Sequence, residues 1–145
     1  MPDIYRAPEV ILGMKWSYNV DIWNVAMVVW DLFEHSHLFQ GRNPENKYDE
    51  AHHLAEMVAV LGPPPLDFLK RSEYSLLYWD ENGNWRGPVP IPSVDLEQLE
   101  QRLEGEDRDG FLRFIRKMLR WTPEERPTAG EVTFDPWLME GLFDS

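Results

Sequence analysis

The apolar stretch from Val20 to Phe33 constrains the fold of this chain more than any other segment. Apart from two aspartates and one asparagine, every position in it is hydrophobic, so a helix built from it would be apolar on every face. Such a helix is either buried inside a domain or placed in a bilayer. The run is too short for a comfortable membrane span and carries carboxylates near both ends. We therefore predict a central, buried core helix over residues 19–35, with packing partners on all sides.

Composition narrows the class of protein further. The chain has 145 residues, a length that suits one domain. Its 14 basic and 26 acidic side chains give a net charge of −12, so we expect no nucleic acid and no membrane surface as a partner. The absence of cysteine excludes disulfides, thiolate zinc sites and cysteine nucleophiles. No basic start with an apolar leader follows Met1, so we expect a soluble, intracellular protein.

Residues 48–61 predict a second, different helix. Apolar residues follow helical spacing on one face of this segment, while Glu50, His53 and Glu56 fall largely elsewhere. This pattern is typical of an amphipathic helix at the surface. Gly62 and the three prolines after it end the helix in a stiff, extended stretch.

Residues 62–108 predict an irregular insertion. The segment 79–85 holds an Asn-Gly pair between two tryptophans, which favours a short hairpin with cross-strand packing of the two rings. Three prolines within 88–92 then impose extended backbone. A short helix capped by Ser93 or Asp95 follows, and an acidic run comes after it.

Residues 109–139 predict the closing helices. The clearest helical stripe in the chain consists of Phe111, Phe114, Ile115, Met118 and Leu119. Basic side chains between Arg113 and Arg120 occupy the rest of that helix, and we interpret them as solvated surface and not as a nucleic-acid patch. Thr128 and Glu131 have the spacing of a capping box for a last helix that ends near Asp135-Pro136. The fold class that follows is mainly α.

Two kinds of local pattern suggest a metal site, and both fail on spacing. The histidine pairs at His35 and His37 and at His52-His53 lack the i, i+4 spacing and the carboxylate partners of a helical metal site. Residues 80–84 open like a calcium loop, but the sixth position is Trp85 where such a loop needs glycine. We therefore expect no metal-binding residue in this chain.

Three separated motifs resemble those of the protein kinase family. Tyr5-Arg6-Ala7-Pro8-Glu9 resembles the A-P-E element that ends a kinase activation segment. Asp21-Ile22-Trp23 is similar to the start of the large central helix of a kinase C-terminal lobe, and Arg126-Pro127-Thr128 is similar to the motif that closes that lobe. With the helix at 48–61 and the insertion after it, the chain resembles the group of cyclin-dependent, MAP and SR-protein kinases, and most closely the SR-protein-kinase-like enzymes of fungi.

The resemblance implies that residues 1–145 form a partial kinase domain. Its fold would be the helical C-terminal lobe of a protein kinase, incomplete, with residues 1–13 as the end of the activation segment. It also implies a structural, buried ion pair between Glu9 and Arg126, because the planar guanidinium binds a carboxylate with two parallel bonds. The alternative is that both residues are ordinary surface charges.

The resemblance assigns roles to four further residues. Asp21 and Trp23 would support the catalytic loop, and Tyr5 and Arg6 would lie in the loop that receives the residue after the phosphorylated Ser or Thr. Each role has a simpler alternative. A carboxylate in the first turn of a helix favours the helix dipole by itself, and an arginine near a terminus is commonly solvated.

Phosphate transfer needs parts that this sequence does not carry. No G-x-G-x-x-G, V-A-I-K-like lysine, H-R-D or D-F-G motif occurs in it. We therefore expect no catalytic and no cofactor-binding residue in this chain, while the complete family domain uses ATP and Mg²⁺. The leading hypothesis is a C-terminal-lobe part of a Ser/Thr kinase that is inactive alone. The alternative is a non-catalytic protein-binding module, a pseudokinase-like remnant.

Partners and location follow from the same resemblance. A protein partner or protein substrate would dock on residues 48–108, and the protein would act in the cytoplasm or nucleus. The central helix would lack some of its covering partners in this chain. We expect Trp23, Met27, Trp30 and Phe33 to be partly uncovered, which would expose an apolar patch and promote self-association.

Overall fold

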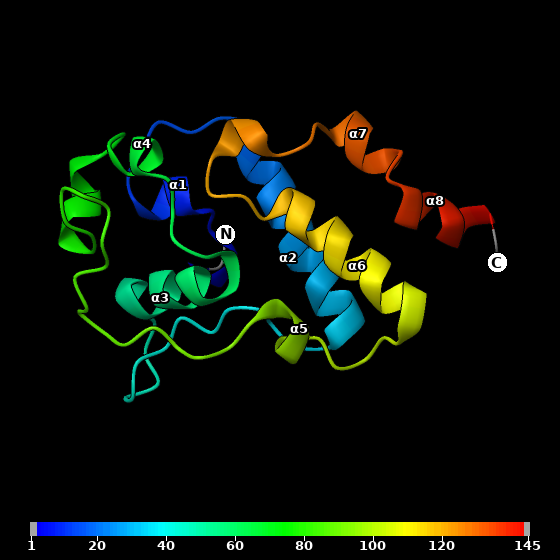
Figure 1. The fold of residues 1–145 in the computed structure, drawn as a ribbon, viewed down its shortest axis with the longest axis horizontal. Helices are drawn as coiled ribbons and strands as arrows, with labels where there is room; N and C mark the ends of the chain where they lie inside the picture. Colours follow the sequence, from blue (N-terminus) through cyan, green and yellow to red (C-terminus); the bar gives the residue numbers. More distant parts are fainter. Residues whose placement is uncertain (1–2, 144–145) are drawn as a thin grey trace.

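The computed structural model describes residues 3–143 and consists mainly of helices (Figure 1). The α-helices are α1 (Pro8–Ile11), α2 (Asn19–Glu34), α3 (Glu50–Leu61), α4 (Leu66–Leu69), α5 (Leu96–Leu99), α6 (Gly105–Met118), α7 (Ala129–Thr133) and α8 (Pro136–Phe143). Short 3-10 turns lie at η1 (Asp3–Tyr5), η2 (Glu73–Leu77) and η3 (Pro123–Glu125). Within 3–143, β-pairing is limited to two isolated bridges, so the expected mainly α class is confirmed.

Helix α2 lies at the centre, side by side with α6 (Figure 1). It spans Asn19–Glu34, against an expected range of 19–35, and ends where His35 takes a left-handed conformation with φ of 57°. Trp30 of α2 stacks on Phe111 of α6 with ring centroids 5.6 Å apart. Burial of aromatic side chains of this size contributes about 2–3 kcal/mol each, so this contact is a main source of stability.

One face of α2 is open to solvent, which corrects the expectation of burial on all sides. Val25, Val28 and Leu32 are 40%, 49% and 68% exposed. The tryptophans and Met27, which we expected to be uncovered, are fully buried, because α6 and the loop after α2 cover them; Phe33 alone of that set is 39% exposed. The uncovered patch therefore exists, but different side chains form it.

Helix α3 is amphipathic, but one residue that we expected on its polar face is buried. Asp49 caps it by accepting a hydrogen bond from the backbone N–H of His52 at 3.1 Å, and Gly62 ends it at φ of 82°. We placed His53 on the polar face, but its side chain is fully buried against Phe39 and Tyr48. Burial lowers the pKa of His53 to about 4, so this imidazole is neutral.

The insertion contains the expected hairpin. Trp79 and Trp85 form an antiparallel bridge, and their rings meet edge to face at 5.2 Å. Gly83 provides the turn with φ of 84°, a conformation that costs glycine little. Trp79 also packs on Trp121, so the hairpin is attached to the segment after α6. Asp95, and not Ser93, caps α5 in a capping box.

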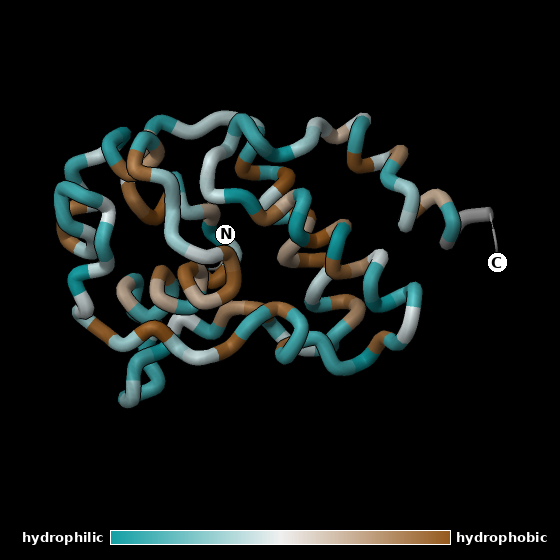
Figure 2. The backbone as a smooth tube through the Cα atoms, in the orientation of Figure 1, coloured by the Kyte–Doolittle hydropathy of each residue, from teal (hydrophilic) through white to brown (hydrophobic). Residues whose placement is uncertain are grey.

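The closing helices differ from expectation at two ends. Helix α6 begins at Gly105, so the acidic run belongs to its first turn, where carboxylates favour the helix dipole. The capping box of Thr128 and Glu131 is present on α7. A further helix, α8, begins at Pro136, where we placed the end of the last helix. Hydrophobic residues recur between hydrophilic ones along α6, as expected for a helix with one apolar face (Figure 2).

Candidate functional site

The first candidate residues lie in and just before α1. Ala7 has extended backbone, and Pro8 occupies the first turn of α1, where its missing N–H costs nothing. This short helix turns the side chain of Glu9 inward, and Glu9 is only 1% exposed. A buried carboxylate at this position needs a cationic partner, because an unpaired buried charge is very costly.

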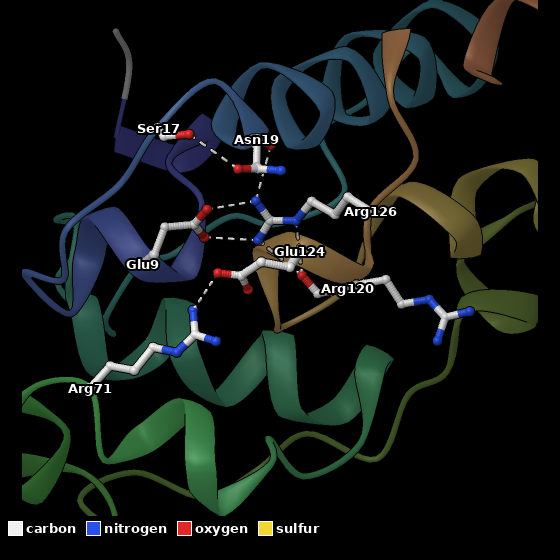
Figure 3. A network of polar contacts seen from close by, with 7 residues as sticks. All are labelled: Glu9, Ser17, Asn19, Arg71, Arg120, Glu124 and Arg126. Carbon is white, nitrogen blue, oxygen red and sulfur yellow. Dashed lines mark hydrogen bonds and ion pairs between the residues drawn. The ribbon is translucent and has the colours of Figure 1, made fainter. Parts of the chain in front are cut away.

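That partner is Arg126, which lies 117 residues away in the sequence. Nη1 of Arg126 donates to Oε2 of Glu9 at 2.6 Å, and Nη2 donates to Oε1 at 2.8 Å (Figure 3). The two parallel bonds make a bidentate pair, the strongest geometry available to arginine and a carboxylate. Both side chains are essentially inaccessible to solvent. The structure therefore brings together the two residues that the resemblance paired.

The remaining donors of Arg126 are also satisfied. Its guanidinium donates to the backbone carbonyl of Asn19 at 3.1 Å and twice to that of Arg120, at 3.0 and 2.9 Å (Figure 3). The guanidinium carbon also lies 5.2 Å from the ring centroid of Trp23, a cation–π distance. One side chain thus joins α1, the start of α2 and the segment that follows α6. We call Glu9, Arg126 and these acceptors the anchor.

A second ion pair lies at the rim of the anchor and differs from it in burial. Arg71 contacts Glu124 at 3.0 Å, with side chains 41% and 64% exposed (Figure 3). Ion pairs in such exposure contribute little, about 0–1 kcal/mol, because water competes for both charges. The rim pair is therefore a natural control for the buried one.

Asp21 and Trp23, both in α2, differ in burial. Asp21 is exposed and makes no side-chain hydrogen bond within the described part of the chain. Trp23 is fully buried, stacks on Phe39 at 6.3 Å and lies beneath Arg126. Its indole N–H is buried without a hydrogen-bond partner in residues 3–143. The structure does not give these two residues a common contact.

Tyr5 and Arg6 make different contacts. The hydroxyl of Tyr5 donates to a carboxylate oxygen of Asp31 in α2, and the His37 ring lies 3.0 Å from that same oxygen. The hydrogen bond to Asp31 raises the pKa of Tyr5. Arg6 forms an exposed ion pair with Asp3 at 2.7 Å. The loop before α1 is therefore held on α2 through Tyr5, while Arg6 stays at the surface.

Asp31 is the site residue that sequence reasoning did not single out. Its second oxygen is buried without a partner in the described residues. The signal was present, because Asp31 is one of two aspartates in an otherwise apolar run, and a charge there needs a partner. Sequence alone did not show that Tyr5, 26 residues earlier, supplies it.

The described residues offer no cluster for a resident metal. Within residues 3–143, no group of three or more His, Cys, Asp or Glu side chains converges as metal ligands would. In the same span, none of the helices has both the length and the apolar character needed to cross a membrane. The polar contacts described here are a buried ion pair between Glu9 and Arg126 and hydrogen bonds that join Asp31 to Tyr5 and His37.

Comparison with known proteins identifies the protein family to which the chain belongs. Residues 2–138 match the family model described as the protein kinase domain. Because this match covers nearly all of the chain, the chain belongs to the protein kinase family. A MAP kinase of Leishmania major has the same fold over 99% of this chain, with a TM-score of 0.73 at 22% identity, and the chain covers 38% of it. The fold is therefore that of the helical C-terminal lobe.

Individual relatives narrow the group. The chain is 57% identical over 138 residues to a serine/threonine protein kinase of Aspergillus fumigatus, a match that covers 95% of this chain and 35% of the relative. It is 33% identical over 142 residues to the serine/threonine-protein kinase SRPK of Physarum polycephalum, covering 94% of this chain and 33% of that protein. The expected likeness to SR-protein kinases and fungal enzymes is thus confirmed, and the chain spans about a third of the length of these relatives.

Proposed function

We propose that these residues serve as the C-terminal-lobe scaffold of a protein that transfers the γ-phosphate of ATP to Ser or Thr side chains of other proteins. The observation that carries the proposal is the anchor. It holds the motif of residues 5–9 against the centre of the lobe through two bonds of 2.6 and 2.8 Å. A loop that must receive a substrate needs such support, because small displacements of positioning groups strongly reduce rates.

In this proposal the chain by itself does not transfer phosphate. The sequence lacks a glycine-rich phosphate loop, the lysine that contacts the phosphates, a metal-binding D-F-G aspartate and the H-R-D base. ATP and Mg²⁺ would be held by other parts of a complete kinase domain. The anchor, Tyr5 and Arg6 would shape the substrate side only.

A direct experiment tests this division of roles. The purified chain is titrated with Mg-ATP in a calorimeter and incubated with labelled ATP, alone and with a basic Ser-rich peptide. We expect no binding heat and no label in protein or peptide. Stoichiometric Mg-ATP affinity or autophosphorylation would contradict the proposal. As a positive control, a polypeptide that joins this chain to a kinase half carrying H-R-D and D-F-G should gain both signals.

A second candidate function, a non-catalytic binding module, is supported by the insertion. A hollow of about 440 Å³ lies between α4, η2 and the hairpin, with Leu66, Leu69 and Leu76 among its lining residues. Leu76 and Leu77 nearby are 45% and 61% exposed. Exposed apolar side chains beside a hollow are typical of protein interfaces. The 48–108 region is therefore our proposed docking surface for a protein partner or substrate.

Substitutions of exposed leucines distinguish docking at this surface from non-specific hydrophobic binding. A Leu76→Asp, Leu77→Asp variant should lose a partner that wild-type chain retains in a pull-down, whereas the exposed Phe134→Asp control should keep it. Retention of the same partner by all three proteins, or capture of none by wild type, would count against docking here. We also propose that the protein acts in the cytoplasm or nucleus, without nucleic-acid or membrane partners.

The open face of α2 supports a proposal of self-association. Val25, Val28 and Leu32 present a continuous apolar stripe at i, i+3 and i+7. In light scattering after size exclusion, wild-type chain should elute above monomer mass, and Leu32→Glu should shift it toward monomer. A wild-type monomer at high micromolar concentration would argue against this proposal.

A further inference from the structure

Two buried glutamates join the C-terminal end of α2 to the linker between α5 and α6, residues 100–104 (Figure 1). Glu34, the last residue of α2, is 7% exposed, and Glu100, directly after α5, is 4% exposed. Glutamate is almost never buried to this extent unless its charge is compensated. We call Glu34 and Glu100 the carboxyl pair; it is separate from the anchor.

Each carboxyl group of the pair has one oxygen bonded to the backbone and one without a donor. Oε1 of Glu34 accepts a hydrogen bond from the backbone N–H of Gln101 at 2.8 Å. Oε2 of Glu100 accepts two such bonds, from Arg102 and Leu103, both at 2.8 Å. Oε2 of Glu34 and Oε1 of Glu100 are buried and receive no hydrogen bond from the residues that the structure describes. The two carboxyl groups lie within hydrogen-bonding reach of each other.

This contact is unfavourable while both groups are ionised, because each then offers only lone pairs and the two charges repel. A single proton between them removes both difficulties, and the surroundings place it on Glu34. Burial, together with the hydrogen bond to Glu100, raises the pKa of Glu34. Burial also opposes the charge of Glu100, but the bond from Glu34, the two backbone N–H groups and Arg108 together lower the pKa of Glu100.

The charges that face the pair balance only one carboxylate. Nε of Arg108, in α6, lies 3.1 Å from Oε1 of Glu100. Arg102 in the linker is exposed, so water screens its charge. A protonated Glu34 beside ionised Glu100 and Arg108 is therefore electrically neutral. The other titratable side chains on the neighbouring elements are exposed or bound elsewhere; they are Asp31, His35, His37, Asp95, Glu97 and Glu104.

A metal ion fits this contact less well than a proton. The guanidinium of Arg108 already lies beside the oxygen of Glu100 that would have to bind the metal, and the two cations would repel. Within residues 3–143, no third His, Cys, Asp or Glu side chain joins the pair in a metal-like cluster. A proton needs only the two oxygens that are present.

We propose that the folded chain binds one proton between Glu34 and Glu100 and keeps it above the pH at which glutamate ordinarily ionises. The shared proton adds a second bond to the one between Glu34 and Gln101, so both hold the linker on α2. When the proton leaves, repulsion between two buried carboxylates loosens the linker. Because the linker ends the insertion, pH then controls how firmly the insertion is attached to α2.

The direction of the pH dependence follows from proton uptake on folding. Above the ordinary pKa of glutamate, the unfolded chain has lost this proton, whereas the folded chain keeps it at Glu34. The free energy of unfolding therefore falls as the pH rises through the raised pKa of Glu34. Glu34→Gln should abolish this dependence. Its amide nitrogen donates to Glu100, and its amide oxygen accepts from Gln101, at every pH.

Urea unfolding of the full chain between pH 5 and pH 8 tests the proposal. At pH 8 the midpoint of Glu34→Gln should lie about 0.5 M above wild type, as expected for one regained hydrogen bond, and this gap should shrink toward pH 5. Glu100→Gln makes the same chemical change but removes the charge opposite Arg108, so its midpoint should fall below wild type. The control Glu45→Gln, at an exposed position, should behave like wild type.

NMR titration of the glutamate carboxyl carbons in wild-type chain observes the proton directly. The Glu34 signal, assigned by its loss in Glu34→Gln, should titrate at higher pH than the signal of exposed Glu45. Titration of the two signals together would overturn the proposal, and this result does not depend on the folding of any variant. A midpoint of Glu34→Gln below wild type, or a gap between the two proteins that stays constant from pH 5 to pH 8, would overturn it as well.

Discussion

Removal of the negative charge at the anchor should cost more stability than any other single change of charge in the lobe. Glu9→Gln keeps the shape of the side chain but leaves a fully buried guanidinium without its counter-ion. The carbonyls of Asn19 and Arg120 would still accept its hydrogen bonds, yet they carry only partial charges. The loss of one partner from a buried pair costs about 3–5 kcal/mol. Since domains are stable by about 5–15 kcal/mol, much of the total is at stake.

Urea unfolding followed by circular dichroism measures this loss. With a slope of roughly 2 kcal/mol per molar urea, the midpoint should fall by about 2 M. The control is Glu124→Gln at the exposed rim pair with Arg71, which should change stability by less than about 1 kcal/mol. A double-mutant cycle with Arg126→Met should show coupling, because removal of both partners costs less than the sum. Equal midpoints for Glu9→Gln and Glu124→Gln would refute the argument that burial makes the anchor strong.

Three further predictions concern the core and the helix ends. Burial lowers the pKa of His53 from 6.5 to about 4, so the free energy of unfolding should fall by about 3 kcal/mol as the pH drops from 6.5 to 4. The urea midpoint of His53→Gln should change less over that range. Parallel plots of urea midpoint against pH for the two proteins would contradict this. Gly110→Ala should destabilise by about 1–3 kcal/mol because its Cβ would lie 2.4 Å from Trp137. At Gly130 a Cβ would meet only the Thr128 hydroxyl oxygen, at 3.9 Å, so Gly130→Ala should be neutral or stabilising by up to about 1 kcal/mol. Thermal melts that rank these two variants the other way would disprove the contact. Thr128→Ala should cost about 1 kcal/mol by removing the cap of α7, a loss that urea titration would detect and that an unchanged midpoint would exclude.

The main helices were predictable because their patterns are local. The apolar run gave α2 within one residue, and the stripe gave the body of α6. The hairpin and the capping box on α7 depend on short motifs with a direct backbone cause, and both are present. Family resemblance, and not local pattern, suggested the pairing of Glu9 with Arg126, since no sequence rule links residues this distant.

The failures have physical causes that a single sequence hides. His53 is polar by type, but a neutral imidazole with Tyr48 as a hydrogen-bond partner at 2.9 Å tolerates burial. The start of α8 was misassigned because proline ends one helix and begins another equally well. Here Asp135 accepts a bond from the backbone N–H of Trp137 at 2.9 Å, which makes Pro136 a first-turn residue. Exposure on α2 depended on which tertiary partners were in the chain, and periodicity does not report that.

The anchor has a topological consequence for the polypeptide. It joins residues 117 positions apart, and the exposed Asn82 turn of the hairpin lies between them. A protease that cleaves this turn would break the covalent connection between the two residues. The two fragments would stay associated through the bonds of the Arg126 guanidinium and the surrounding contacts. The lobe should therefore be obtainable as two separately expressed peptides that reassemble on mixing.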